Sequence, residues 1–207
     1  MGKRSDFEKR PKDMYLTPRE AVIPLVPFLP SKRFRFAEPC AGDGRLVDHL
    51  EELTNGVCDF ISDIDPEGVI EMLADEGKLP YRDDVRERDI FDIDPAELVD
   101  YDAVITNPPW TRDKKSGYLL HKIIEHLVKS QTSVWLLFDA DWMQTVQAAE
   151  LLRSYCVQIV SVGRVKWIED SKMTGKDNCC WYEFRYDAPT MGARAPLFWG
   201  RYKNMAG

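Results

Sequence analysis

Residues Asn107 to Trp110 place an amide, two prolines and a large aromatic ring directly after an apolar, β-branched run at 101–106. That run predicts a short buried strand, and the prolines end it because neither can donate a hydrogen bond to a strand ladder. The Asn107 amide is therefore expected at the carboxyl end of a strand, beside a rigid carbonyl and the Trp110 ring. Open α/β sheets bind ligands at that edge. An ordinary strand-ending turn is the alternative, so the preceding motifs decide between the two.

A glycine-rich stretch, Glu-Pro-Cys-Ala-Gly-Asp-Gly, runs from Glu38 to Gly44. It follows an alternating segment at 33–37 that predicts a strand, and it precedes a predicted helix that begins near Arg45. Glycine permits a tight turn and a close approach of the backbone to a ligand. Strand, glycine turn and helix together predict a ligand-binding unit.

An acidic residue ends the next predicted strand, which covers 57–62. Asp63 follows about 20 residues after the glycine turn, a position suited to binding ribose hydroxyls. Asp65 is the alternative ribose ligand if the strand ends two residues later. A further strand over 85–91 carries Asp89 near its end.

The remaining periodicity predicts alternating strands and helices. A capping box at Thr17-Pro18-Arg19-Glu20 is expected to open a short or kinked helix over 20–29. Further helices are expected at 66–77, 118–129 and 142–155, further strands at 102–106, 134–138, 157–167 and 180–186, and a polar loop at 111–117. This order predicts an α/β fold of the Rossmann-like class: a mostly parallel seven-stranded sheet with an antiparallel hairpin edge and helices on both faces.

Length and composition predict one elaborated domain over 15–207 after a mobile basic tail at 1–14. Five cysteines without Cys-x-x-Cys spacing, and three histidines without ligand spacing, predict a reduced, cytoplasmic protein without a metal site. No apolar run approaches the ~20 residues of a membrane span. The net charge of −7 conceals an asymmetry, because residues 38–107 hold 21 acidic and 5 basic side chains while 1–37 hold 9 basic and 4 acidic. Net charge therefore does not exclude a nucleic-acid partner.

Four ordered motifs, Glu38-Pro-Cys-Ala-Gly-Asp-Gly, Asp63-Ile-Asp-Pro, Asp89-Ile-Phe and Asn107-Pro-Pro-Trp, resemble those of the class I S-adenosylmethionine-dependent methyltransferases. More narrowly, they resemble the DNA adenine (N-6) amino-methyltransferases in which the cofactor motif precedes the catalytic motif. Tyr15-Leu-Thr-Pro resembles the amino-terminal cofactor motif of that branch. The resemblance covers about residues 15–186. Family members usually carry a sizeable target-recognition domain, whereas only about 20 residues follow the last predicted strand here. We therefore expect a small, phage-like type, and the departure puts sequence specificity in doubt more than chemistry.

The resemblance implies S-adenosylmethionine as the cofactor and a flipped adenine of DNA as the substrate. Asn107 and Pro108 would accept the two amine hydrogens, and Trp110 would stack on the base. The resemblance assigns to the cofactor Tyr15, Thr17, Glu38, Cys40, Gly42, Asp43, Asp63, Asp89, Ile90 and Asn107. Trp167 would be a second aromatic contact of the base, with a core tryptophan as the alternative. The cations in loops that would face phosphates are Arg112, Lys114, Lys115, Lys172 and Lys176, with a solvated surface as the alternative.

Three other functions remain open at this stage. An RNA adenine methyltransferase would carry the same motifs, and a sister branch with a similar motif methylates glutamine side chains of proteins. The acidic surface suits a protein partner, whereas the Thr-Pro motif and the basic loops favour DNA. A non-catalytic module that retains the cofactor fold is the third alternative, disfavoured because Asn107 and Trp110 are both present. The recognition sequence and the oligomeric state are not predicted.

Overall fold

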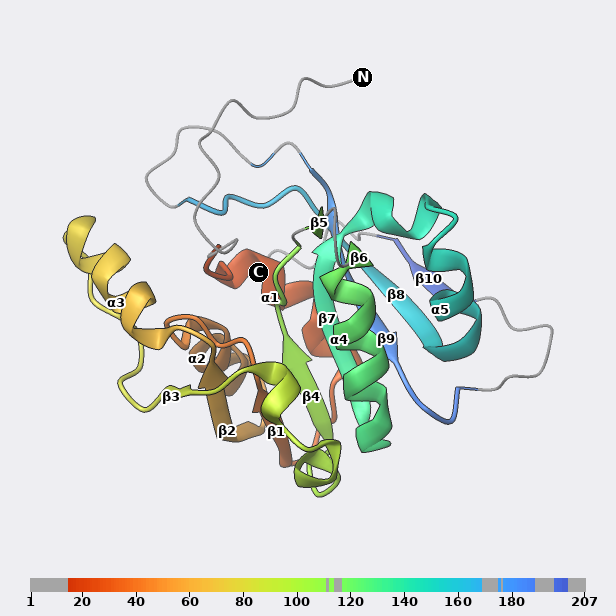
Figure 1. The fold of residues 1–207 in the computed structure, drawn as a ribbon, viewed down its shortest axis with the longest axis horizontal. Helices are drawn as coiled ribbons and strands as arrows, with labels where there is room; N and C mark the ends of the chain where they lie inside the picture. Colours follow the sequence, from red (N-terminus) through yellow and green to blue (C-terminus); the bar gives the residue numbers. More distant parts are fainter. Residues whose placement is uncertain are drawn as a thin grey trace.

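The computed structural model describes residues 15–110, 112–113, 117–168, 175, 177–188 and 196–200, so the predicted tail at 1–14 lies outside it. A sheet of eight strands in the order β10-β8-β9-β7-β4-β1-β2-β3 forms its centre (Figure 1). These strands are β1 (Phe34–Glu38), β2 (Gly56–Asp63), β3 (Arg86–Glu87), β4 (Ala103–Thr106), β7 (Ser133–Asp139), β8 (Cys156–Gly163), β9 (Cys179–Phe184) and β10 (Leu197–Trp199). A separate antiparallel pair consists of β5 (Arg112–Asp113) and β6 (Gly117–Tyr118).

Helices and short helical turns connect the strands. The α-helices are α1 (Arg19–Val22), α2 (Arg45–Leu53), α3 (Pro66–Asp75), α4 (Leu119–Leu127) and α5 (Ala148–Tyr155). The 3-10 turns are η2 (Ile23–Phe28), η3 (Ile90–Asp92), η4 (Pro95–Leu98), η5 (Val128–Ser130) and η6 (Ala140–Gln144). In Figure 1, α4 and α5 lie on one face of the sheet, with α1 and α2 on the other. The predicted α/β fold with two helical layers is confirmed.

Two apolar clusters, one on each face of the sheet, form the core. Strand side chains alternate between them, so that Phe36 and Leu137 pack with α1 and α2 while Ala37 and Leu136 pack with α4 and α5. Burial on both faces explains why the sequences of β4 and β7 are nearly continuous apolar runs. The indole of Trp181 on β9 donates to the Ala21 carbonyl of α1 at 2.8 Å, which fastens that helix to the sheet.

The predicted edge hairpin is present, but its second strand is not at the edge. β9 pairs antiparallel with both β7 and β8, and β10 then adds parallel to the outer side of β8. All six residues of β9 are buried, as expected of an interior strand. Its one acidic residue, Glu183, accepts hydrogen bonds from Ser133 (2.8 Å) and Gln158 (2.7 Å) on the two flanking strands. The prediction of seven strands with an edge hairpin is therefore corrected to eight strands with the hairpin inside the sheet.

Several local predictions were also wrong. Thr17 does not cap α1, whose amino-terminal flank is Pro18, and the Glu20 carboxylate accepts from the Lys166 N–H at 2.6 Å instead. The predicted loop at 111–117 contains the β5–β6 pair, and the predicted helix at 142–155 divides into η6 and α5. The Thr145 hydroxyl, which accepts from the Ala148 N–H at 3.3 Å, marks the break between those two segments. At Thr145 a side chain therefore competes for a backbone group that a regular helix would have used.

Candidate functional site

The four sequence motifs lie side by side at one edge of the sheet. β4, β1, β2 and β3 are consecutive neighbours, and each is parallel to the next. Their carboxyl ends therefore bring together Glu38, Asp63, Asp89 and Asn107. The chain reverses its strand order on either side of β1, which is where open α/β sheets hold ligands.

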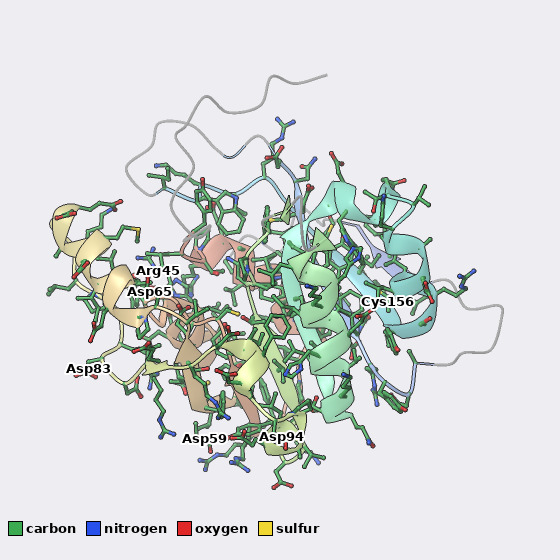
Figure 2. All side chains as sticks on the ribbon, in the orientation of Figure 1. Arg45, Asp59, Asp65, Asp83, Asp94 and Cys156 are labelled. Carbon is green, nitrogen blue, oxygen red and sulfur yellow. The ribbon has the colours of Figure 1, made fainter. Side chains whose placement is uncertain are left out.

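Asp63 joins the end of β2 to the glycine turn. Its Oδ2 accepts from the Gly42 N–H at 2.9 Å, and its Oδ1 accepts from the Asp65 N–H at 3.0 Å. Gly42 has a φ of 57°, the left-handed region that favours glycine. Asp65 has a separate task, since its Oδ1 accepts from the Gly68 N–H and caps α3 (Figure 2). Asp63 is therefore the acidic residue joined to the glycine turn. β2 ends at Asp63, as the sequence predicted, and not two residues later at Asp65.

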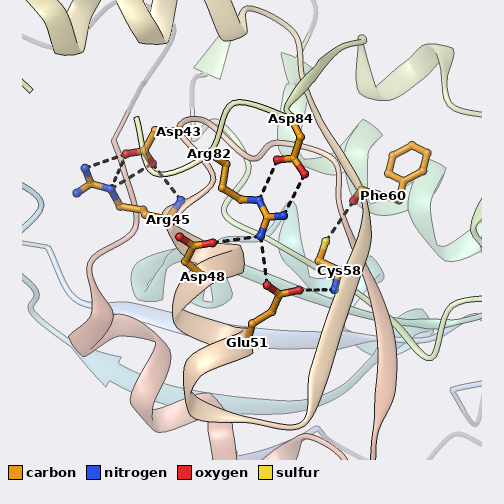
Figure 3. A network of polar contacts seen from close by, with 8 residues as sticks. All are labelled: Asp43, Arg45, Asp48, Glu51, Cys58, Phe60, Arg82 and Asp84. Atoms are coloured by element: carbon orange, nitrogen blue, oxygen red, sulfur yellow. Dashed lines mark hydrogen bonds and ion pairs between the residues drawn. The ribbon is translucent and has the colours of Figure 1, made fainter. Parts of the chain in front are cut away.

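Asp43 is paired with an arginine two residues later in the chain. The Asp43 carboxylate is buried and forms an ion pair with Arg45, 2.9 Å between Oδ2 and Nη2, while its Oδ1 also accepts from the Arg45 N–H (Figure 3). A buried carboxylate needs such a partner because desolvation of an unpaired charge is costly. Asp43 therefore stabilises the start of α2, and the predicted contact with the cofactor stays without structural support.

Arg82 holds the loop before β3 against the glycine turn. Its N–H donates to the Asp43 carbonyl at 3.0 Å, and its side chain packs over Gly44. Its guanidinium pairs with three carboxylates, those of Asp48, Glu51 and Asp84 (Figure 3). Gly44 has a φ of 83°, and a Cβ there would lie 2.7 Å from the Arg82 side chain. The turn is thus shaped both by its own glycines and by a distant loop.

Glu38 is a fully buried carboxyl group at the end of β1. Its Oε1 accepts from the Thr106 hydroxyl at 2.5 Å and from the Cys40 N–H at 3.3 Å. Its Oε2 is buried and has no hydrogen-bond partner within the part of the chain that the structure describes. Desolvation, reinforced by the nearby Asp63 charge, raises the pKa of Glu38 well above its usual value. Glu38 is therefore a buried carboxyl group that favours its protonated form. It directly precedes Pro39 and Cys40, which line the pocket described below, but it is not part of that lining.

Asn107 is held by hydrogen bonds on both sides of its amide. Nδ2 donates to the Tyr15 carbonyl at 3.2 Å and to the Thr17 hydroxyl at 3.1 Å. Oδ1 accepts from the Trp110 indole N–H at 3.2 Å. Thr17, predicted to contact the cofactor, thus contacts the catalytic candidate.

The two tryptophans of the predicted base site are in contact with each other. Their ring centroids are 5.4 Å apart at an interplanar angle of 88°. The Trp110 N–H also donates to the Leu137 carbonyl at 3.1 Å, and the ring packs against both core clusters. Trp167 packs against the cluster beneath α1 and α2. The perpendicular rings form a corner in which one ring could stack on a base while the other contacts its edge.

A pocket opens along the carboxyl edge of the strands. Of the residues predicted for the cofactor, its lining includes Tyr15, Cys40, Gly42, Asp63, Asp89, Ile90 and Asn107. Apolar residues absent from the sequence prediction complete the wall, among them Phe91, Leu119 and Ile123. Phe91 directly follows Asp89 and Ile90 in the third motif, and its ring is 38% exposed in the structure. Its place in that motif was the sequence signal that could have assigned it to the pocket. Leu119 and Ile123 follow the helical period of α4 and could not be distinguished from core residues.

Two lining residues have further roles. Asp89 caps η3, since its Oδ1 accepts from the Phe91 N–H at 2.9 Å. Burial and the neighbouring Glu38 carboxyl raise the pKa of the Cys40 thiol well above its usual value. Cys40 is therefore a neutral thiol in the pocket wall and a poor nucleophile.

Most of the predicted phosphate contacts are not described by the structure. Lys114, Lys115, Lys172 and Lys176 lie outside the described residues, and only the backbone of Arg112 is described, in β5. No group of three or more potential metal ligands occurs within the described residues. Across the same residues, no helix has the length and apolar character needed to cross a bilayer.

No protein family model and no curated protein sequence matches the chain. Solved structures do match it. A protein of Listeria monocytogenes, proposed to be a class I S-adenosylmethionine-dependent methyltransferase, superimposes with a TM-score of 0.57 at 12% identity over 93% of this chain and 67% of its own. The chain has the class I methyltransferase fold. Open α/β sheets hold ligands at the carboxyl edge of their strands, and the four motifs of this chain meet at that edge.

Two further methyltransferase structures come from restriction systems. The modification subunit of a proposed type I restriction enzyme from Vibrio vulnificus matches with a TM-score of 0.53 at 14% identity, over 90% of this chain and 46% of that one. The M protein of the type I restriction enzyme EcoKI matches with a TM-score of 0.50 at 14% identity, over 83% and 44%. The chain thus spans less than half the length of these two modification proteins. At such identities the likeness concerns the methyltransferase fold alone.

Proposed function

We propose that the protein is an S-adenosylmethionine-dependent methyltransferase that acts on the exocyclic amine of adenine in DNA. The proposal rests on the position of Asn107. It lies at the end of β4 and lines the same pocket as Asp63 and Asp89. An amide acceptor and two carboxylates are then within one cavity, with the Trp110–Trp167 corner adjacent to Asn107. The motif resemblance supports DNA as the substrate, and two of the proteins with this fold are modification proteins of type I restriction enzymes.

The residues of the pocket fit S-adenosylmethionine chemically. Asp63 offers carboxylate oxygens for ribose hydroxyls, and the exposed ring of Phe91 beside Ile90 offers an apolar surface for a purine. The cofactor, a sulfonium, supplies an electrophilic methyl group when bound.

The protein's part in the reaction is to orient and polarise the amine. The exocyclic amine of adenine is a poor nucleophile because its lone pair is delocalised into the ring. Asn107 Oδ1 and the Pro108 carbonyl accept the two amine hydrogens, which localises that lone pair and stabilises the positive charge that develops on the nitrogen. The base leaves the duplex to reach these acceptors, and the tryptophan corner holds it.

The test is a methyl-transfer assay with labelled S-adenosylmethionine and three substrates: DNA, RNA and a protein with accessible glutamines. Transfer to adenine of DNA is expected. Asn107→Ala should reduce kcat by ~10²–10³ with little change in cofactor affinity, because it removes one preorganised acceptor. Asn55→Ala is the matched control, since Asn55 is exposed and its side-chain amide donates to the Ser31 carbonyl. Transfer to RNA or to protein alone, or full activity of Asn107→Ala, would refute the proposal.

A further inference from the structure

We propose that Thr17 and Trp110 are positioning residues that, with the Tyr15 carbonyl, set the orientation of the Asn107 amide. The inference rests on the proposed function, since it concerns how the acceptor for the amine is aimed. It also reassigns Thr17, which the sequence placed at the cofactor.

The hydrogen bonds around Asn107 define the amide orientation without ambiguity. A backbone carbonyl only accepts and an indole N–H only donates. Nδ2 must therefore be the atom beside Tyr15, at 3.2 Å, and Oδ1 the atom beside Trp110, at 3.2 Å. Rotating the amide by half a turn would place Oδ1 against the Tyr15 carbonyl, so that two acceptors meet. It would also place Nδ2 against the Trp110 N–H, so that two donors meet.

Both sides of this arrangement are anchored in rigid parts of the molecule. Thr17 is 4% exposed and immediately precedes α1, which is fastened to β9 by the Trp181–Ala21 hydrogen bond. On the other side, the Trp110 N–H is shared with the carbonyl of Leu137, a fully buried residue of β7. The Asn107 side chain is thus held between the amino-terminal segment and the neighbouring strand.

This arrangement leaves one acceptor position on Oδ1. A carbonyl oxygen has two lone pairs, and the Trp110 N–H occupies one of them. Both Nδ2 hydrogens have acceptors, those of Tyr15 and Thr17. The substrate amine therefore meets a single lone pair whose direction is set by three other groups.

The same contacts require an amide at position 107. An aspartate would keep an acceptor for the substrate, yet it would direct a carboxylate oxygen at the Tyr15 carbonyl, where no hydrogen remains to bridge the two. The Thr17 hydroxyl could rotate to donate, whereas the carbonyl could not adapt. Asn107→Asp is therefore expected to lose activity although its acceptor is retained.

The kinetic test compares Thr17→Val, which removes the hydroxyl at nearly constant volume, with Thr17→Ser, which keeps it. Thr17→Val should lower kcat by ~10–100-fold, the scale of a misaligned catalytic group, and Thr17→Ser should restore it. The Kd for S-adenosylmethionine should stay unchanged in both. Thr132→Val is the matched control, because Thr132 is also buried but its hydroxyl donates to the Tyr101 carbonyl instead. A loss of cofactor affinity that accounts for the whole kinetic effect would overturn the inference and return Thr17 to the cofactor site.

A second measurement does not depend on catalysis. The side-chain amide signals of Asn107 in a ¹H–¹⁵N spectrum can be assigned by their disappearance in Asn107→Ala. They should shift in Thr17→Val and in Trp110→Phe, which lacks the indole N–H, and stay in place in Thr17→Ser and Thr132→Val. Unchanged signals in both Thr17→Val and Trp110→Phe would overturn the inference. If the signals shift as expected while the wild-type protein methylates none of the three substrates, the positioning role stands and the proposed function fails.

Discussion

Replacing Asp63 with alanine should damage both the fold and the pocket, and the structure separates the two effects. The carboxylate accepts backbone N–H groups from Gly42 and Asp65 at 2.9 and 3.0 Å. Hydrogen bonds to a charged group contribute about 1.5–3 kcal/mol each, and the lower value applies here because Asp63 is only partly buried. Asp63→Ala is therefore expected to reduce the free energy of unfolding by about 3 kcal/mol.

Cofactor binding should weaken in the same variant. Loss of a charged acceptor for the ribose removes about 1.5–3 kcal/mol, which corresponds to a Kd for S-adenosylmethionine about 10- to 150-fold higher. Asp65→Asn is the control, because asparagine caps a helix as well as aspartate does and α3 keeps its cap. Its unfolding free energy should change by less than about 0.5 kcal/mol.

Urea denaturation and titration calorimetry, both done in the absence of substrate, measure these two quantities. Unchanged affinity in Asp63→Ala together with a large loss in Asp65→Asn would refute the assignment of Asp63 to the ribose. Unchanged stability in Asp63→Ala would refute the claim that it fastens the glycine turn.

Three further predictions concern the buried carboxyl group of Glu38, the glycine turn and the substrate. Glu38 has a raised pKa in the folded protein, so its contribution to stability is present below its unfolded pKa and is lost as pH rises above that value. Glu38→Gln should therefore flatten the decline in unfolding free energy as pH rises above the unfolded pKa of 4.5, measured by urea denaturation, and an unchanged pH profile would contradict this. Gly44→Ala should destabilise the protein more than Gly77→Ala, because both glycines have positive φ but only Gly44 meets the Arg82 side chain; equal thermal midpoints would show that crowding is unimportant. The pure protein should methylate adenine in a short or loosely defined context, with binding that falls steeply with salt, and sequencing of treated plasmid that found one site of six or more base pairs would contradict this.

The sequence predicted the parts of the fold that local pattern determines. The helix beginning at Arg45 and the strand ending at Asp63 were predicted at the observed residues, because a glycine turn and a strand-to-proline transition mark them. The four motifs were expected at one sheet edge, and the structure brings them together there. The interior position of β9 was not predicted. The sequence indicates that β8 and β9 form an antiparallel pair, but it does not indicate which of the two also pairs with β7. The apolar run Cys179 to Tyr182 was its signal, since it lacks the alternation of an edge strand.

The contacts within the site were less predictable than its location. Thr17 and Glu20 form a good local capping pattern, yet their side chains bind Asn107 and the Lys166 N–H, 90 and 146 residues away. Asp43 lies in the glycine motif, and its partner Arg45 is so close in sequence that the ion pair could have been considered. For Thr17 and Glu20, hydrogen bonds to distant residues replace the local capping contacts, and the pattern of a single sequence does not reveal such distant partners.

The position of β9 has a consequence for how the protein folds. β8 has two neighbours in the sheet, β9 and β10, and both come later in the chain. The edges of β7 and β8 that face each other therefore find their partner only in β9, which ends at Phe184. Glu183 then makes the assembly selective, because a slip by one residue would turn its carboxylate away from Ser133 and Gln158 and into an apolar core. Among the described residues, β9 is thus the strand that joins β8 and β10 to the rest of the sheet and fixes their register.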